Sequence, residues 1–177
     1  GKAFLSVEIA KAIAKLGLNL DVCTGGELAV AVAAKFPPAR IEMHGNNKSE
    51  KEIEAALEYG IATIVLDSLH EIERVARLAK ARNLTQKVLI RLNPGVEAHT
   101  HEYITTAIED VKFGFSIASG AAWEAVQLIL KSPNLKLVGV HSHIGSQIFT
   151  SAAFDATAVK LLEFMKRYRD EFNAELP

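Results

Sequence analysis

The sequence predicts an α/β protein in which parallel strands, covered by helices, form a partial (β/α)8 TIM barrel. Short runs rich in Val, Ile and Leu alternate with helical patterns along the chain, which is typical of strands buried on both faces. Four of these runs end at Val22, Gly45, Ser68 and Arg91, 23 residues apart each time, about the length of one βα unit. No G-x-G-x-x-G or G-x-x-x-x-G-K-[ST] motif follows a run, so a barrel is favoured over the common nucleotide-binding open sheets.

Five complete strands are expected, together with the end of another at Lys2. They occupy residues 18–22, 41–44, 63–66, 88–92 and 137–143. Three of the helices that follow begin with the same signal, a hydroxyl residue and then Glu three positions later, which can close a capping box over unpaired N–H groups. The three pairs are Thr24 with Glu27, Ser49 with Glu52, and Ser68 with Glu71.

Each helix is expected to pack one apolar face on the sheet. The first is expected over residues 4–16, and the last shows the pattern most clearly, with apolar residues at helical spacing from Phe154 to Phe172. The polar stretch 96–111 interrupts the repeat after a strand end, so we expect a mobile lid over the site there. No linker divides residues 1–177, which are expected to form one incomplete barrel domain.

Composition excludes several classes of protein. A net charge of -1, from 20 Lys and Arg against 21 Asp and Glu, offers no basic surface for nucleic acid. Hydrophobic residues make up 49% of the chain, yet no apolar run is long enough to span a membrane, so a soluble cytoplasmic protein is expected. The single cysteine, Cys23, excludes an internal disulfide and a Cys-based zinc site.

Polar residues stand at every expected strand end, where parallel α/β folds gather their catalytic groups. Any one of them could instead be a helix cap or a satisfied polar group, but six such strand ends favour a functional site. The candidates are Lys2, Asp21, His44, Asn46, Asn47, Lys48, Asp67, Arg91, Asn93, His141, His143, Ser146 and Gln147.

The segment around His141 and His143 allows two interpretations. If both residues lie on one strand, they face the same side and could bind a metal, which would indicate a metal-dependent barrel hydrolase. Alternatively, one imidazole stacks on an aromatic cofactor while the turn at Gly145 and Ser146 offers a hydroxyl to a ligand. The second interpretation is favoured, because further metal ligands at a tight spacing are missing.

These motifs resemble the diaminopimelate decarboxylase family, which belongs to the pyridoxal-phosphate decarboxylases with an alanine-racemase-like barrel. The resemblance spans nearly the whole chain, and H-G-N-N-K-S together with H-x-H-I-G-S-Q is its most specific part. The segments are G-K-A at 1–3, L-D-V-C-T-G-G-E-L at 20–28, H-G-N-N-K-S at 44–49, V-L-D-S at 65–68, R-L-N-P-G-V at 91–96, K-F-G at 112–114 and H-S-H-I-G-S-Q at 141–147.

The resemblance implies a role for individual residues. Lys2 matches the lysine that bonds covalently to pyridoxal 5'-phosphate, His143 the imidazole that stacks on its ring, and Ser146 a hydroxyl near its phosphate. Asp21 and Arg91 match cofactor-pocket residues, as does Glu27, although Asp21 and Arg91 could instead pair with each other across the barrel mouth. Lys48, the other lysine considered for covalent attachment, is expected to face solvent or phosphate because it directly precedes a helix cap.

The implied reaction is decarboxylation of meso-2,6-diaminopimelate to L-lysine and carbon dioxide, the last step of lysine biosynthesis, by a homodimeric enzyme. The last barrel strands, the glycine-rich phosphate turn and the C-terminal β-domain of the family are not found in these 177 residues, so the chain is expected to be a fragment that is inactive alone. Alternatives are a related decarboxylase of another basic amino acid, of the ornithine or arginine type, a metal-dependent hydrolase, and a non-catalytic homologue.

Overall fold

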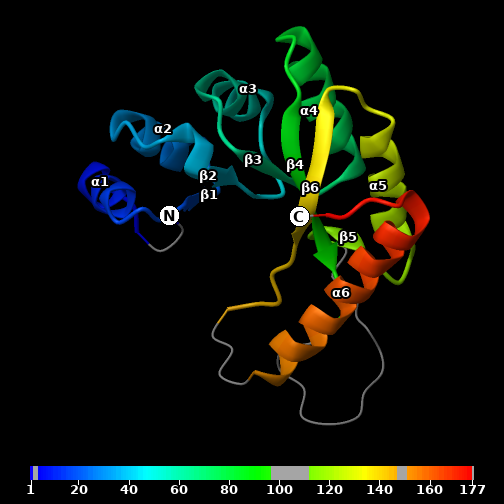
Figure 1. Ribbon diagram of the computed structural model, residues 1–177. Helices are drawn as coiled ribbons and strands as arrows, with labels where there is room; N and C mark the ends of the chain where they lie inside the picture. Colours follow the sequence, from blue (N-terminus) through cyan, green and yellow to red (C-terminus); the bar gives the residue numbers. More distant parts are fainter. Residues whose placement is uncertain (2–3, 97–111, 147–150, 177) are drawn as a thin grey trace.

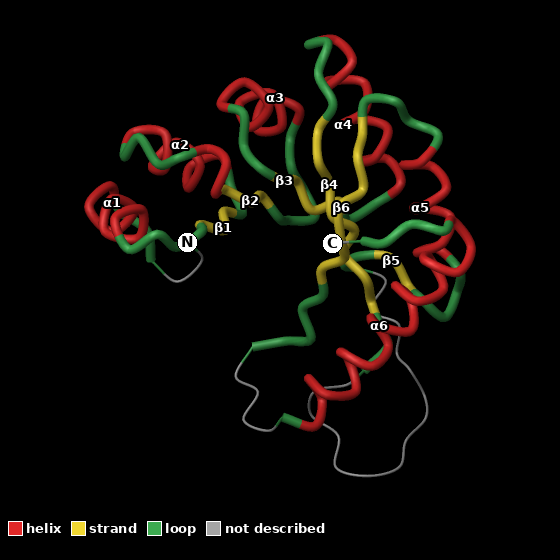
Figure 2. Tube along the Cα trace, in the orientation of Figure 1, coloured by secondary structure: helices red, strands yellow, loops and turns green. Residues whose placement is uncertain are grey.

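The protein forms a curved parallel sheet with helices along its outer side, as seen in a computed structural model that describes residues 1, 4–96, 112–146 and 151–176 (Figures 1 and 2). Lys2, Gln147 and most of the expected lid at 96–111 lie outside the described residues. In chain order the elements are α1 (Val7–Lys15), β1 (Leu20–Val22), α2 (Gly25–Ala33), the 3-10 helix η1 (Pro38–Arg40), β2 (Ile41–Met43), α3 (Glu50–Tyr59), β3 (Thr63–Leu66), α4 (Leu69–Ala81), β4 (Gln86–Asn93), β5 (Phe115–Ser116), α5 (Ala121–Leu130), β6 (Leu135–His141) and α6 (Ala152–Phe172).

All the strand pairs are parallel, which confirms the predicted α/β class. The strands pair in the order β1, β2, β3 and β4. β6 lies along most of β4, whereas β5 pairs only with the last two residues of β4, Leu92 and Asn93. Helices cover the convex side of this arc, so the sheet has the curvature of part of a barrel and its concave side remains open in the described part of the chain (Figure 1).

Apolar and polar residues alternate along the strands, so that the apolar ones form a core against the helices and the polar ones line the inner face of the sheet. Leu20 and Val22 are fully buried on either side of the exposed Asp21, and Ile41 and Met43 are fully buried on either side of Glu42. Because successive strand residues point to opposite faces, Asp21 and its register partner Glu42 both lie on the concave side. Burial raises the pKa of the Glu42 carboxyl, which accepts a hydrogen bond from the hydroxyl of Thr63 at 3.2 Å.

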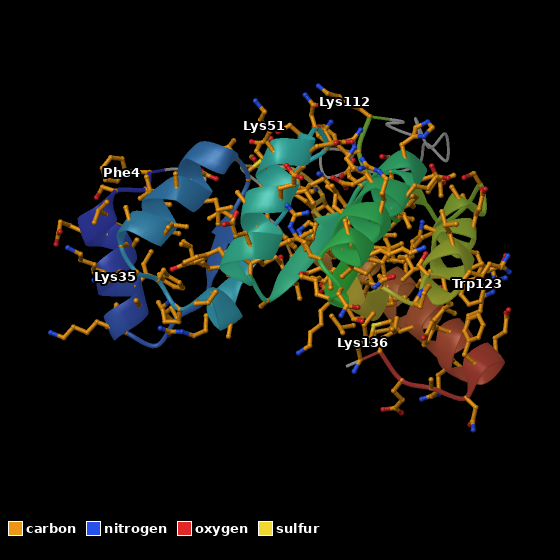
Figure 3. All side chains as sticks on the ribbon, turned by 90° about the horizontal axis from the view of Figure 1, so that it is seen from above. Phe4, Lys35, Lys51, Lys112, Trp123 and Lys136 are labelled. Carbon is orange, nitrogen blue, oxygen red and sulfur yellow. The ribbon has the colours of Figure 1, made fainter. Side chains whose placement is uncertain are left out.

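Aromatic packing fixes α6 against α5. The Trp123 ring meets Phe164 edge-on at 5.5 Å between centroids and stacks on Phe172 at 5.7 Å, while the guanidinium of Arg167 lies 4.0 Å above it. Figure 3 shows Trp123 at this end of the molecule, far from Phe4 and Lys35 at the other. The apolar stripe predicted for the last helix therefore packs in part as expected. No helix in the described part of the chain is both long and apolar enough to cross a membrane.

Several boundaries and one strand differ from the sequence expectations. β1 begins at Leu20, β2 ends at Met43, β4 spans Gln86–Asn93 and β6 begins at Leu135. α1 begins at Val7 because the side chain of Ser6 caps it, and the helix therefore excludes Phe4. β6 ends at His141, so His143 is not a strand residue. The sequence patterns do not predict β5, since two residues give no detectable period. It forms because Gly114, at φ +72°, turns the chain tightly against the carbonyl of Arg91, where a Cβ atom would approach the oxygen to 2.6 Å.

The three expected hydroxyl caps are present at α2, α3 and α4. Thr24, Ser49 and Ser68 each accept the N–H of the Glu three residues later. Only Ser49 and Glu52 close the reciprocal capping box; Glu27 and Glu71 each accept the N–H of the residue before the cap, Cys23 and Asp67 respectively. The carboxylates therefore bind the turn between strand and helix, and Glu52 also accepts the N–H of Gly25 at 2.7 Å from the neighbouring turn.

We expect Glu52→Ala to lower the free energy of unfolding by about 1 kcal/mol at pH 7, because it removes a capping box. Hydrogen bonds from the backbone of Ser49 and Gly25 hold the Glu52 pKa below its usual 4.5, so this stabilisation is present above pH 4.5 and is lost as the pH falls through the lower folded-state pKa. Urea denaturation of the complete gene product at several pH values measures both effects. Glu58→Ala, on an exposed position of the same helix, is the control, and equal losses in the two variants would contradict the assignment.

Candidate functional site

At the ends of β1, β2 and β6, on the concave side of the sheet, Asp21, His44 and His141 come together. His44 directly follows β2, and its N–H donates to the carbonyl of Val22 at 2.9 Å, which fixes it beside the end of β1. Its Nδ1 lies 2.6 Å from a carboxylate oxygen of Asp21. The His44 ring is nearly parallel to that of His141, with 6.3 Å between centroids and 16° between planes. Three residues from distant parts of the chain therefore form one polar cluster.

His141 is a neutral imidazole at the end of the pairing between β4 and β6, where it stands opposite Arg91. Burial lowers its pKa to about 4, with smaller contributions from the neighbouring charges of Arg91 and His44. Its Nδ1 is buried and has no hydrogen-bond partner among the described residues. Since buried polar atoms are nearly always paired, this nitrogen indicates a place where a ligand or water binds.

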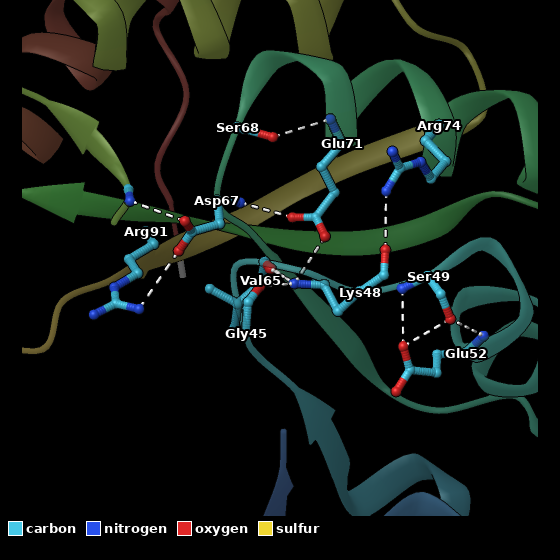
Figure 4. Close-up of polar contacts among 11 residues, drawn as sticks. Gly45, Lys48, Ser49, Glu52, Val65, Asp67, Ser68, Glu71, Arg74 and Arg91 are labelled. Carbon is cyan, nitrogen blue, oxygen red and sulfur yellow. Dashed lines mark hydrogen bonds and ion pairs between the residues drawn. The ribbon is translucent and has the colours of Figure 1, made fainter. Parts of the chain in front are cut away.

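Arg91 is a buried cation that is balanced within the protein. Its guanidinium pairs with the Asp67 carboxylate at 3.5 Å and lies 4.5 Å from the centre of the Phe113 ring. The other oxygen of Asp67 accepts the N–H of Gly114 at 3.1 Å, so β3, β4 and the turn into β5 meet at this carboxylate (Figure 4). Asp21 and Arg91 thus have separate partners, and the alternative that they pair with each other across the barrel mouth is wrong.

Lys48 differs most from the sequence expectation, because it faces neither solvent nor an open site. Its side chain is only 1% exposed, and its ammonium forms an ion pair with Glu71 at 2.9 Å. It also donates to the carbonyls of Gly45 and Val65. No sequence pattern indicates this pair, since Glu71 has a complete local role as a capping residue and Lys48 lies 23 positions before it.

His143 and Ser146 lie in the segment that follows β6. His143 is exposed and lines an open cavity of about 340 Å³ between this segment and α6. Ser142 fixes the start of the segment by donating its hydroxyl to the carbonyl of Leu92 at 3.0 Å. Gly145 has a φ of +129°, which suits glycine, and Ser146 is exposed just after it. His143 lies near the cluster of Asp21, His44 and His141, since its charge is one of the smaller contributions that lower the pKa of His141.

A metal pair at His141 and His143 requires both residues to lie on one strand, where alternation would put them on the same face. β6 ends at His141, so the two residues do not have this arrangement. Among the described residues, no three His, Cys, Asp or Glu side chains are placed to hold a metal ion together. The described polar groups are instead arranged as paired charges, one neutral imidazole and an open cavity.

Comparison with known proteins places this arrangement in a family. Residues 1–176 match the model described as the pyridoxal-binding domain of pyridoxal-dependent decarboxylases. The chain is 55% identical to the diaminopimelate decarboxylase of Mycobacterium leprae (strain TN), over 98% of this chain and 37% of that protein. It is 48% identical to that of Bacillus subtilis (strain 168), over 97% of this chain and 39% of that protein.

Solved structures agree with these sequence matches. The diaminopimelate decarboxylase of M. jannaschii in complex with L-lysine superposes with a TM-score of 0.86 and 34% identity, over 97% of this chain and 39% of that chain. A lysine decarboxylase of Selenomonas ruminantium, at 19% identity and a TM-score of 0.79, shares the fold over 93% of this chain and 40% of that chain. The chain thus spans about two fifths of the length of the diaminopimelate decarboxylases it matches.

We expect His141 to remain neutral down to about pH 4. Because the folded-state pKa is below the ordinary value of 6.5, the folded protein binds fewer protons than the unfolded chain and loses stability as the pH falls from 6.5 towards 4. Imidazole C–H chemical shifts followed against pH by NMR report the titration, and His141→Gln identifies the signal and reduces the loss of stability. A midpoint near 6.5 for this signal would contradict the burial argument.

Proposed function

Because this chain belongs to the pyridoxal-dependent decarboxylases, whose pyridoxal-binding domain it matches over residues 1–176, we propose that it is the cofactor-binding part of a diaminopimelate decarboxylase. The reaction removes the carboxylate at the D-configured centre of meso-2,6-diaminopimelate and yields L-lysine and carbon dioxide. The observation that carries the proposal is the identity of 55% to such an enzyme over 98% of the chain. The 19% identity to a lysine decarboxylase makes another basic amino acid the less favoured substrate.

The described residues suit pyridoxal 5'-phosphate as the cofactor. The buried, unpartnered Nδ1 of His141 marks a place for a polar ligand at the strand ends, and Asp21, His44 and Arg91 surround it with oriented charges and donors. When bound, pyridoxal phosphate supplies the electron sink for decarboxylation. The protein needs to bind this group, fix its plane and hold protons at defined atoms.

We assign four further tasks to residues of this chain. Lys2 forms the covalent attachment to the cofactor, and Gly1, the residue before it, has its nitrogen 2.6 Å from the carbonyl oxygen of Asp21 at the end of β1. His143 packs on the cofactor ring, and Ser146 donates its hydroxyl to the phosphate. Asp21 and Arg91 act in the cofactor pocket, where the Asp21 carboxylate orients the His44 ring through its contact with Nδ1.

The setting of Lys48 supports Lys2 as the attachment residue. An amine can attack a carbonyl carbon only when its lone pair is available, and the ammonium of Lys48 is held by one carboxylate and two carbonyls. We further propose that the complete enzyme works in the cytoplasm as a homodimer, with an amino acid as its small-molecule substrate and without nucleic acid or membrane partners. This follows the resemblance to the decarboxylase family.

The test of the function is an assay of the complete gene product loaded with pyridoxal phosphate. We expect visible absorbance from the bound cofactor and release of carbon dioxide from meso-diaminopimelate at least about 100-fold faster, in kcat/KM, than from ornithine, arginine or lysine. A buried polar site can discriminate ligands on this scale when the wrong one leaves its groups unpaired. Preference for ornithine or arginine would favour the alternative substrate class, and activity restored by zinc alone would favour the hydrolase.

The same preparation identifies the attachment residue. Borohydride reduction fixes the cofactor to its lysine, and peptide mapping is expected to find the label on Lys2. A label on Lys48 would contradict both the assignment and its buried ion pair.

We expect His143→Ala to weaken cofactor binding about tenfold or more and to lower turnover while leaving the fold intact, because an exposed ring that packs on a ligand contributes little to the core. His141→Ala is expected to weaken cofactor binding less, because it removes one ligand-facing atom, Nδ1, whereas His143→Ala removes the whole stacking ring. Cofactor titration followed by fluorescence, with circular dichroism for the fold, measures both. Equal and severe losses that added zinc reverses, and pyridoxal phosphate does not, would show that these histidines bind a metal.

A further inference from the structure

Lys48 and Glu71 form a buried ion pair that no step of the proposed reaction uses. Their side chains are 1% and 4% exposed, and their charged atoms are 2.9 Å apart. Burial of a charge is expensive unless all its hydrogen bonds are made. All three ammonium hydrogens of Lys48 have acceptors here, since the carbonyls of Gly45 and Val65 add to the carboxylate of Glu71.

The partners of this pair are backbone groups at the strand ends. The second oxygen of Glu71 accepts the N–H of Asp67 at 2.8 Å. Asp67 in turn pairs with Arg91 and accepts the N–H of Gly114. Figure 4 shows the resulting chain of contacts, which runs from the turn after β2, through the pair, to the end of β3 and on to β4.

Gly45 joins the pair to the histidine cluster. It follows His44 directly and has a φ of +117°, and a Cβ atom there would lie 3.2 Å from the carbonyl oxygen of Cys23. The turn is therefore pressed closely against the end of β1, and Lys48 holds it by the Gly45 carbonyl. The backbone of Lys48 is held as well, since its own carbonyl accepts a hydrogen bond from Arg74 at 2.9 Å.

We propose that the ion pair of Lys48 and Glu71 is a positioning unit for the cofactor site, which acts through the backbone of Gly45 and Asp67 to place His44 and Arg91. The inference rests on the proposed function for its cofactor readout. Neither side chain needs to contact a ligand. Burial raises the pKa of Glu71, and the charge of Lys48 opposes this rise, so loss of the lysine leaves a carboxyl that ionises less readily and binds its backbone partner less strongly.

If the pair of Lys48 and Glu71 only stabilised the fold, its removal would act like the removal of any other ion pair near these helices. Two further ion pairs already connect α3 to α4: the exposed pair of Glu50 with Arg77, and the partly exposed pair of Glu54 with Arg82 just beyond the end of α4. They join helix to helix, whereas the buried pair joins a helix to the strand-end turns. Glu50→Gln is therefore a matched control that removes a charge between the same two helices without touching a turn.

The experiment compares Lys48→Met, Glu71→Gln, the double variant and Glu50→Gln in the complete gene product. Melting temperature and hydrogen exchange of peptides covering residues 41–49 and 63–68 are measured without cofactor, and pyridoxal phosphate affinity is measured by titration. Each single variant leaves a buried polar group unpaired, so a lower melting temperature is expected. The double variant is expected to recover much of the melting temperature, because it buries no lone charge.

Cofactor affinity separates positioning from stability. We expect it to fall about tenfold or more in both single variants and to remain low in the double variant, with faster exchange at residues 41–49, because a methionine side chain has no N–H to donate to the Gly45 carbonyl. Glu50→Gln should match the wild type in every measurement. Recovery of affinity together with melting temperature in the double variant, or unchanged exchange in Lys48→Met, would overturn the proposal. If the wild-type protein binds no pyridoxal phosphate, the proposed function fails, while the exchange data still decide whether the pair positions the turns.

Discussion

At each turn from strand to helix, some backbone N–H groups are paired neither by the sheet nor by the helix and need another acceptor. The caps, the buried ion pair and the polar rim of this structure all depend on which groups accept them. Glutamates at the third position of α2, α3 and α4 provide the acceptors. Two of them reach beyond the cap residue to the turn itself. Because the strands are parallel, all these turns lie at one edge of the sheet, so a requirement of local structure also shapes the rim where the polar cluster forms.

The pKa of the capping glutamate is shifted in opposite directions at two of these turns, and the difference in burial is the reason. Glu52 is only partly buried and binds backbone N–H groups, which lowers its pKa. Glu71 is buried, which raises its pKa even though Lys48 lies beside it. A partly exposed glutamate can cap a helix without an ion-pair partner, whereas a buried one needs a cation beside it. The lysine in H-G-N-N-K-S is therefore explained by the burial of a carboxylate on α4, the second helix after it.

Much of the fold was predictable from the sequence, because the strand cores and hydroxyl caps are local patterns. The strand at 63–66 and the caps at Thr24, Ser49 and Ser68 have the predicted positions. The extent of β6 and the burial of Lys48 were not predictable, since both depend on contacts between residues far apart in the chain. Sequence patterns put His44 and His141 at strand ends, but their stacking and the unpartnered nitrogen required the curvature of the sheet.

Charge pairing at the rim limits how an anionic cofactor group can be bound. Asp21 is paired with His44, Arg91 with Asp67, and His141 is neutral near pH 7, so these described side chains present no excess positive charge. At the N-termini of α2, α3 and α4 the cap hydroxyl already accepts the N–H of the third residue, and the glutamate at that position repels an approaching anion. N–H and hydroxyl donors outside these three turns are therefore better placed to bind a phosphate. The segment after β6 offers such donors, since Gly145 and Ser146 follow a strand without capping one of these helices.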